Sequence, residues 1–266
     1  MAKSNGVALI TGASRGIGAV YAERLAQRGH DLILVARDQR RLEHLASRLA
    51  STTKRQVSII TADLSQPAGV RRVEEELAAN PRIDFVVNNA GAATMGGPLH
   101  DSDPAKADSL IQLNITALTR IARAAGNAFS RRRAGTLVNI SSALAIKVRA
   151  NTAVYSGTKA YVLQFSRVLQ EELKDSGVTV QVVLPGAVAT DIWAANGVDV
   201  NALPKGTVMT AEDLVDAALA GLDQGERITL PSLPEIADWD RFLAAEAKVT
   251  QGLSLEHSAE RYREVA

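Results

Sequence analysis

The feature that most constrains the fold is a short apolar run that leads directly into a glycine-rich turn. Residues 7–10 are all apolar, and Gly12, Gly16 and Gly18 follow them. Such a run is typical of a parallel strand that is buried on both faces. Glycines let backbone N–H groups approach a ligand, and a helix that begins at Gly16 directs the positive end of its dipole toward the turn. The stretch therefore predicts a pyrophosphate site, and the alternative is a turn that merely packs a helix on a strand.

Strand and helix patterns alternate along the rest of the chain. Apolar runs predict further strands at 31–36, 57–61, 83–88, 135–140, 178–184 and 227–230. Apolar residues at helical spacing predict helices at 19–28, 39–50, 67–79, 104–130, 152–175 and 211–223. We expect an α/β fold, a Rossmann-like doubly wound seven-stranded parallel sheet with helices on both faces. Residues 1–266 are expected to form a single domain, with a core at about 6–232 and a C-terminal helical extension at about 233–266.

Composition and charge exclude several classes of function. The net charge of +1 gives no electrostatic reason to bind nucleic acid or an anionic membrane. The absence of cysteine excludes disulfides and thiolate sites. The four histidines lack the spacing of metal ligands, so no metal is expected. Residues 1–6 contain no apolar leader, and no run reaches the ~18 apolar residues of a membrane span, so we expect a cytoplasmic protein.

Two arginines indicate which dinucleotide binds at the predicted turn. An enzyme that uses NAD places a carboxylate after the second strand, where Ala36 and Arg37 stand in this chain. Arg15 lies inside the glycine turn and can reach the same region, so the pair favours the 2′-phosphate of NADP(H) over NAD(H). Asp38 can neutralise Arg37, and the alternative is that both arginines are solvated surface charges.

A second group of chemical interest is Tyr155 with Lys159. Residues four apart share one face of a helix, and the predicted helix at 152–175 contains both. A nearby ammonium favours the phenolate, which brings proton exchange closer to neutral pH than an isolated phenol of pKa about 10 allows. Taken alone, such a pair is also compatible with two ordinary surface residues.

The motifs in their order and spacing identify a family. They are Gly12-x-x-x-Gly16-x-Gly18, Asp63-Leu64, Asn88-Asn89-Ala90-Gly91, Asn114, Ser141-Ser142, Tyr155-x-x-x-Lys159 and Pro185-Gly186-x-x-x-Thr190. Over about residues 6 to 232 the chain resembles the short-chain dehydrogenase/reductase family. The resemblance implies an oxidoreductase that transfers a hydride between a nicotinamide and a carbonyl or alcohol, and it implies a homodimer or homotetramer.

The resemblance also implies roles for four catalytic residues. Tyr155 would be the general acid in reduction and the general base in oxidation, and Ser142 would hydrogen-bond the substrate oxygen. Lys159 would lower the tyrosine pKa and hold the nicotinamide ribose, while Asn114 would support a water on the proton path. Chemistry alone leaves Ser141 and Ser142 open as the serine, and the family spacing favours Ser142.

Cofactor contacts are implied at the carboxyl ends of the strands. They are Gly12, Ser14, Arg15, Gly16, Ile17, Gly18, Arg37, Asp63, Leu64, Asn88, Ala90, Gly91, Tyr155, Lys159, Pro185, Gly186, Val188 and Thr190. For the segment Asn88 to Gly91 an equal alternative is that its side chains stabilise the sheet through bonds to backbone.

Substrate contacts are the least constrained by sequence. The family places a variable flap after Gly186, and apolar residues there and elsewhere suggest an apolar pocket for a small neutral ketone or aldehyde. The candidates are Met95, Leu144, Ile192 and Trp193. Ordinary packing is the alternative for each of them. The C-terminal extension can cover the substrate cleft, pack on a partner subunit or cap the sheet edge.

Two other functions fit parts of the sequence. A sensor that binds NADP(H) without chemistry can use the same fold, but it has no need of the set Asn114, Ser142, Tyr155 and Lys159. A sugar-nucleotide epimerase or dehydratase needs a larger C-terminal substrate domain than 266 residues provide. We therefore favour the reductase.

Overall fold

The computed structural model describes residues 6–93, 97–191, 193, 199 and 202–263. It divides into two units, Met1–Pro231 and Ser232–Ala266. The larger unit contains the sheet and all candidate site residues that the structure describes.

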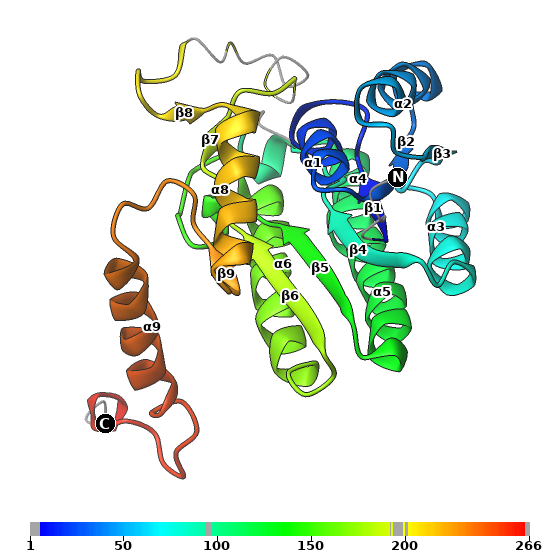
Figure 1. Ribbon diagram of the computed structural model, residues 1–266. Helices are drawn as coiled ribbons and strands as arrows, with labels where there is room; N and C mark the ends of the chain where they lie inside the picture. The colour runs from blue at the N-terminus through cyan, green and yellow to red at the C-terminus, as the bar shows by residue number, and fades with distance from the viewer. Residues whose placement is uncertain (1–5, 94–96, 192, 194–198, 200–201, 264–266) are drawn as a thin grey trace. The chain divides into compact units, whose positions relative to one another are not determined.

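Seven parallel strands form the main sheet (Figure 1). In spatial order they are β3 (Val57–Thr61), β2 (Asp31–Ala36), β1 (Val7–Thr11), β4 (Ile83–Asn88), β5 (Gly135–Ile140), β6 (Val178–Val183) and β9 (Ile228–Thr229). The chain runs outward from β1 to β3 and then returns to the other side of β1 with β4. This reversal creates a switch point between β1 and β4, where ligands of doubly wound sheets bind. The predicted Rossmann-like fold is confirmed.

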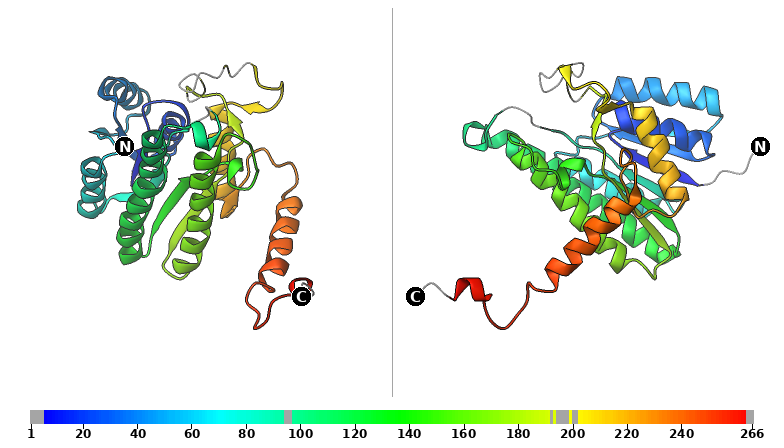
Figure 2. Two further views of the ribbon diagram at one scale, coloured as in Figure 1. Left: turned by 180° about the vertical axis from the view of Figure 1, so that it is seen from behind. Right: turned by 90° about the vertical axis from the view of Figure 1, so that its left-hand side faces the viewer.

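Helices cover both faces of this sheet. One face carries α1 (Gly16–Gln27), α2 (Gln39–Thr53) and α8 (Ala211–Asp223), and the other carries α3 (Pro67–Ala79), α5 (Leu118–Arg132) and α6 (Ala153–Glu172). Alternate residues of β1 enter the two cores: Ala8 and Ile10 pack under the first group, and Val7 and Leu9 under the second. Figure 2 shows α1 and α8 on the side of the sheet opposite to α5 and α6. The central strands β1, β2 and β4 are buried on both faces, which explains their apolar sequences, whereas the edge strand β3 is only partly buried.

Two local features differ from the sequence expectation. The predicted helix at 104–130 consists of α4 (Pro104–Ile111), a π-helical segment at Gln112–Ala117 and α5. The short strands β7 (Ala187–Val188) and β8 (Val208–Met209) pair in a second, two-stranded sheet that periodicity does not indicate. Both differences fall beside candidate site residues, because Asn114 lies in the π-helical segment and Val188 in β7.

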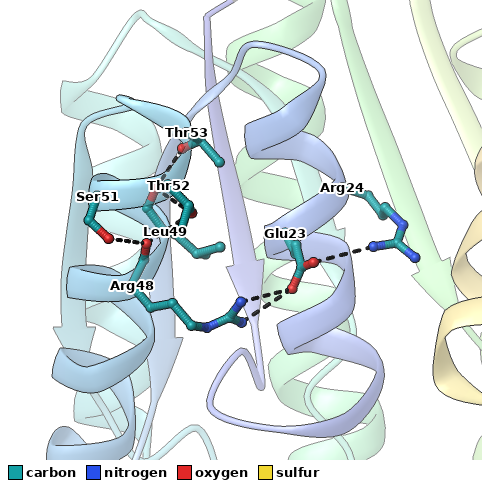
Figure 3. A network of polar contacts seen from close by, with 7 residues as sticks. All are labelled: Glu23, Arg24, Arg48, Leu49, Ser51, Thr52 and Thr53. Atoms are coloured by element: carbon teal, nitrogen blue, oxygen red, sulfur yellow. Dashed lines mark hydrogen bonds and ion pairs between the residues drawn. The ribbon is translucent and has the colours of Figure 1, made fainter.

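Ion pairs join α1 to its neighbours on the same face. Both terminal nitrogens of Arg48 in α2 donate to Glu23 Oε2 in α1 at 3.2 Å, and Glu23 also pairs with Arg24 (Figure 3). On its other side Arg24 donates to Asp216 of α8, with Nε 2.7 Å from Oδ1. At the end of α2 the hydroxyl of Thr53 donates to the carbonyl oxygen of Leu49. The ion pairs link α1 to α2 and α8, and the first turn of α1 faces the glycine loop.

The C-terminal unit contains one long helix, α9 (Ile236–Thr250), and a 3₁₀ turn at Glu260–Tyr262. Within α9 the rings of Trp239 and Phe242 are stacked with their centroids 5.0 Å apart. Residues Ile236–Thr250 are thus helical, and the extension at 233–266 and its role stay predictions.

Candidate active site

The turn between β1 and α1 requires glycine at several positions. Gly12 and Gly16 have φ of +67° and +54°, a region that favours residues without a side chain. A Cβ on Gly18 would lie 2.4 Å from the carbonyl oxygen of Gly12. Arg15 directly precedes α1, and its side chain makes no capping hydrogen bond to the helix. The N–H groups of the first helical turn therefore remain available to an anion. This turn fits a pyrophosphate.

Thr11 and Asn89 hold the glycine turn against the end of β4. Thr11 Oγ1 accepts hydrogen bonds from the backbone N–H groups of Asn89 and Ala90, each at 3.0 Å. Asn89 Nδ2 donates to the carbonyl oxygen of Thr11 at 2.9 Å. The bond of Asn89 agrees with the sheet-stabilising alternative that the sequence left open, whereas sequence reasoning missed Thr11. The signal was present, because a hydroxyl ends β1 and an amide follows β4 at a switch point where the two strands are neighbours.

Several predicted cofactor residues have structural contacts of their own. Asn88 is buried, and its Nδ2 donates to the carbonyl oxygen of Leu118 at 2.9 Å, which agrees with the sheet-stabilising alternative. Leu64 and Val188 are buried in the two main cores. The carbonyl oxygen of Pro185 accepts from the N–H of Ala143 at 2.7 Å. The side chains of Leu64 and Val188 are therefore engaged in packing, and their backbone atoms are the groups left to meet a ligand.

The two serines after β5 are separated by their contacts. Ser141 Oγ donates to the carbonyl oxygen of Lys159 at 2.7 Å and is buried. Ser142 Oγ accepts from the N–H of Leu144 at 3.1 Å, and its side chain is hydrogen-bonded to Tyr155. Ser142 is therefore the serine that meets the phenol, whereas Ser141 links the end of β5 to α6.

Tyr155 and Lys159 lie together on α6, as their spacing predicts. Lys159 Nζ lies 5.7 Å from the centre of the Tyr155 ring and donates to the carbonyl oxygen of Ile140 at 3.0 Å. Burial raises the pKa of the Tyr155 phenol, and the hydrogen bond with Ser142 acts in the opposite direction. Burial lowers the pKa of Lys159 to about 8. In the protein without cofactor, burial thus outweighs the expected effect of the ammonium on the phenol.

Asn114 connects three segments around Lys159. Its Oδ1 accepts from the N–H of Ala92 at 3.0 Å, and its Nδ2 donates to the carbonyl oxygen of Ala92 and to Thr158 Oγ1 at 2.9 and 3.1 Å. A Cβ on Gly91 would lie 3.2 Å from Asn114 Oδ1 and 3.6 Å from Lys159 Nζ. The predicted residues Asn114, Gly91 and Lys159 are therefore neighbours, and sequence reasoning missed Ala92 and Thr158.

The adenosine side of the switch point contains charged groups at the ends of β2 and β3. Partial burial acts to raise the pKa of Asp63, but hydrogen bonds from Ser65 and the charge of Arg37 lower it overall. The sequence left open that Asp38 neutralises the charge of Arg37. In the structure Asp38 instead caps α2 by accepting from the N–H of Arg41, and it also pairs with the Arg41 side chain. Arg41 was not among the predicted residues, although it lies one helical turn after the cap.

The candidate substrate residues are only partly described. Met95 and Ile192 lie outside the described residues. Trp193 is buried, and its Nε1 donates to the carbonyl oxygen of Val188 at 2.7 Å. Leu144 is half-buried in the 3₁₀ turn Ala143–Ala145. Trp193 is therefore held against β7, and both Trp193 and Leu144 stay candidates for substrate contact.

In the ranges that the structure describes, there is no group of three or more histidine, aspartate or glutamate side chains placed to hold a metal ion. Within the same ranges, none of the helices combines the length and the apolar character needed to cross a membrane.

A doubly wound sheet, a glycine turn at its switch point and a tyrosine–lysine pair beside it define a dinucleotide-binding class of protein. The sequence model of the short chain dehydrogenase family matches residues 6–201. The chain belongs to the short-chain dehydrogenase family, as the motifs implied.

Two solved structures resemble the chain along nearly its whole length. A short-chain dehydrogenase from Sphingobium yanoikuyae in complex with NADPH is 44% identical, with a TM-score of 0.93, and the match covers 97% of this chain and 100% of that one. A bulky-bulky ketone specific alcohol dehydrogenase from Comamonas testosteroni is 40% identical, with a TM-score of 0.89 and coverage of 98% and 99%.

A curated relative shares a shorter region. The 17-beta-hydroxysteroid dehydrogenase type 3 of Homo sapiens is 38% identical over 184 residues, which are 69% of this chain. The chain spans 59% of the length of that relative. The shared part therefore agrees with the family assignment.

Proposed function

We propose that this protein is an NADPH-dependent oxidoreductase that interconverts a ketone and a secondary alcohol, with Tyr155 as the general acid and base. The observation that carries the proposal is the cluster in which the Tyr155 phenol is hydrogen-bonded to Ser142 and lies beside the buried Lys159. A binding protein without chemistry has no need of a phenol held in this way.

The four residues have separate tasks in carbonyl reduction. Ser142 and Tyr155 together hold the substrate oxygen, and Tyr155 donates a proton to it. Because burial raises the pKa of Tyr155, the phenol is protonated at neutral pH and ready to act as an acid. Lys159, with a pKa of about 8, then stands beside the phenol as the group able to exchange its proton near neutral pH. When bound, the nicotinamide would supply the hydride.

Asn114 stabilises the backbone around Tyr155 and Lys159. It fixes Ala92 and Thr158 by hydrogen bonds, and Thr158 Oγ1 donates in turn to the carbonyl oxygen of Tyr155 at 2.8 Å. The π-helical turn directs the Asn114 amide toward α6. We therefore assign Asn114 a positioning role for the backbone that holds Tyr155 and Lys159.

The preference for NADP(H) is supported by Arg15 and Arg37. Both lie at the adenosine side of the switch point, and β2 is followed by Arg37 where an NAD enzyme has a carboxylate. The Sphingobium relative was solved in complex with NADPH. An arginine pair suits a 2′-phosphate because guanidinium groups bind phosphate oxygens in a bidentate manner.

A ketone with bulky substituents is the substrate class we propose. The Comamonas relative is described as specific for such ketones, and Leu144 and Ile146 give the segment after Ser142 an apolar character. We also propose a homodimer or homotetramer, since Ile111 and Val168, on helices next to the site, are exposed apolar residues. Size-exclusion chromatography with light scattering tests the oligomeric state.

The function is tested by cofactor titration followed by turnover assays. NADPH is expected to bind more tightly than NADH, and the parent is expected to reduce at least one member of a panel of bulky ketones, ketosteroids, oxoacyl thioesters and small ketones. Tyr155→Phe should lower kcat by about 10² to 10⁴-fold and change NADPH binding far less, because the ring that contacts the cofactor is kept. Tyr161→Phe is the matched control, because Tyr161 lies on the same helix and its hydroxyl pairs with Thr119.

Two outcomes would contradict the proposal. If NADH binds as tightly as NADPH or more tightly, the assignment of Arg15 and Arg37 to the 2′-phosphate of NADP(H) is wrong. Tight NADPH binding without turnover of any panel member would instead favour a sensor of NADP(H).

A further inference from the structure

Two arginines, one directly before α1 and one in α2, converge on one carboxylate at the edge of the cofactor site. Arg15 Nη1, at the start of α1, lies 3.1 Å from Asp191 Oδ2. Arg41 Nη1, in the first turn of α2, lies 3.3 Å from the same oxygen. The two arginines thus form a site for an anion, and a side chain of the protein occupies it.

Asp191 belongs to the segment that follows β6, which also touches the glycine turn. A Cβ on Gly16 would lie 3.2 Å from Thr190 Cγ2, so Thr190 and Gly16 are in close contact. The N–H of Ala189 donates to the carbonyl oxygen of Met209 at 2.9 Å, which fixes the segment from its other side. Asp191 is therefore held near Arg15 by its backbone as well as by its charge.

The contact is easily displaced by a stronger anion. The three side chains are about half exposed, at 49% for Arg15, 51% for Arg41 and 55% for Asp191. Exposed ion pairs are weak because water screens them. A phosphate monoester carries up to two negative charges and three acceptor oxygens, so it competes well against a single carboxylate.

We propose that Asp191 is an internal competitor for the 2′-phosphate of NADP(H), which must displace it from Arg15 and Arg41. Arg41 thereby becomes a further residue that determines cofactor specificity. Asp191 lowers the affinity for NADP(H) without changing that for NAD(H), and its release links the adenosine end of the site to the segment 187–191. This inference rests on the proposed NADP(H) function. The lowered pKa of Asp191, caused first by the hydrogen bond from Arg15 and also by that from Arg41, agrees with a carboxylate that is charged at neutral pH.

The experiment is isothermal titration of the full chain with two fragments, 2′,5′-ADP and 5′-AMP, which differ in the 2′-phosphate. In Asp191→Asn the affinity for 2′,5′-ADP is expected to rise by about fivefold, while that for 5′-AMP stays the same. Asp216→Asn is the matched control, since Asp216 pairs with Arg24 and has the same 55% exposure. It should change neither affinity.

A second variant tests the role of Arg41 itself. Arg41→Met should lower the affinity for 2′,5′-ADP by about tenfold and leave the affinity for 5′-AMP unchanged. In the double variant, Asp191→Asn should give a smaller gain than it does in the parent, because one of its two partners is gone.

The outcomes separate this inference from the proposed function. If the parent prefers 2′,5′-ADP but Asp191→Asn binds it no better than the parent, the competitor role is wrong and the NADP(H) preference stands. If the parent binds both fragments equally, the NADP(H) preference itself fails, and the inference falls with it.

Discussion

Ser141 and Lys159 are joined by a hydrogen bond of 2.7 Å from the serine hydroxyl to the lysine carbonyl oxygen. Ser142, the next residue, instead has its side chain on the Tyr155 phenol. Of the two adjacent hydroxyls after β5, that of Ser141 thus makes a structural bond to α6, and that of Ser142 bonds to the proposed catalytic acid. Sequence alone could not assign these tasks, because both serines follow the same strand.

Substitution of the two serines is expected to affect two different properties, activity for Ser142 and stability for Ser141. Ser142→Ala should lower kcat by about 100-fold, because it removes a hydrogen bond to the developing oxyanion, and it should leave NADPH binding intact. Ser141→Ala should keep most of the activity and lower the free energy of unfolding by about 1 kcal/mol, the usual effect of a lost internal hydrogen bond. Steady-state kinetics and urea unfolding of both variants check this division. A larger loss of kcat in Ser141→Ala would reverse the assignment.

Burial of Lys159 predicts a pH dependence of stability. Its pKa falls from 10.5 to about 8 on folding, so the unfolded chain binds this proton more tightly. Below pH 8 the folded protein bears the whole free-energy cost of burying the charged Lys159 side chain. This cost decreases as the pH rises toward 10.5. Relative to Lys159→Met, the parent should therefore gain about 2 kcal/mol of unfolding free energy between about pH 7 and about pH 9.5.

Urea unfolding without cofactor at several pH values measures this difference. The exposed Lys174 provides the control, since Lys174→Met removes a lysine from the surface just beyond α6. Its unfolding free energy should follow the parent at every pH. Parallel curves for the parent and Lys159→Met would show that Lys159 is not buried as an ammonium.

The strands and most helices of this fold could be predicted, whereas the contacts that complete the site could not. Apolar runs located β1, β2 and β4 because both faces of these strands are buried, and the edge strand β3 kept enough apolar residues to be located although it is only partly buried. The π-helical segment at Gln112–Ala117 escaped prediction, since one wider turn leaves the apolar spacing of a long helix almost unchanged. Its position follows from the bonds of Asn114 to Ala92 and Thr158, which are tertiary contacts.

The same limit applies to the arginines. Arg15 and Arg37 were predicted because they lie next to recognisable turns. The contact between Arg41 and Asp191 joins residues 150 positions apart and depends on how the segment after β6 folds back. The pairing of β7 with β8 guides that segment, and strands of two residues carry no periodic pattern.

Asn114 is expected to be important for stability as well as for the site. Asn114→Ala removes three hydrogen bonds and leaves the N–H of Ala92 without this acceptor, so the free energy of unfolding should fall by about 2 to 4 kcal/mol. Thr158→Val removes one of those bonds and a bond to Tyr155, and it should cost about 1 to 2 kcal/mol. Urea unfolding of both variants and of the double variant measures the coupling. Strict additivity of the two losses would contradict a shared network.

The glycine turn can be tested by comparing two Gly→Ala substitutions in helices. A Cβ at Gly18 would lie 2.4 Å from the backbone oxygen of Gly12, so Gly18→Ala must displace the turn and should weaken NADPH binding by more than about tenfold. A Cβ at Gly157 in α6 meets nothing within 4 Å, so Gly157→Ala should raise the free energy of unfolding by about 0.5 to 1 kcal/mol. Its NADPH affinity should equal that of the parent. Unchanged NADPH affinity in a folded Gly18→Ala variant would mean that the turn does not hold the pyrophosphate and only packs α1 on β1.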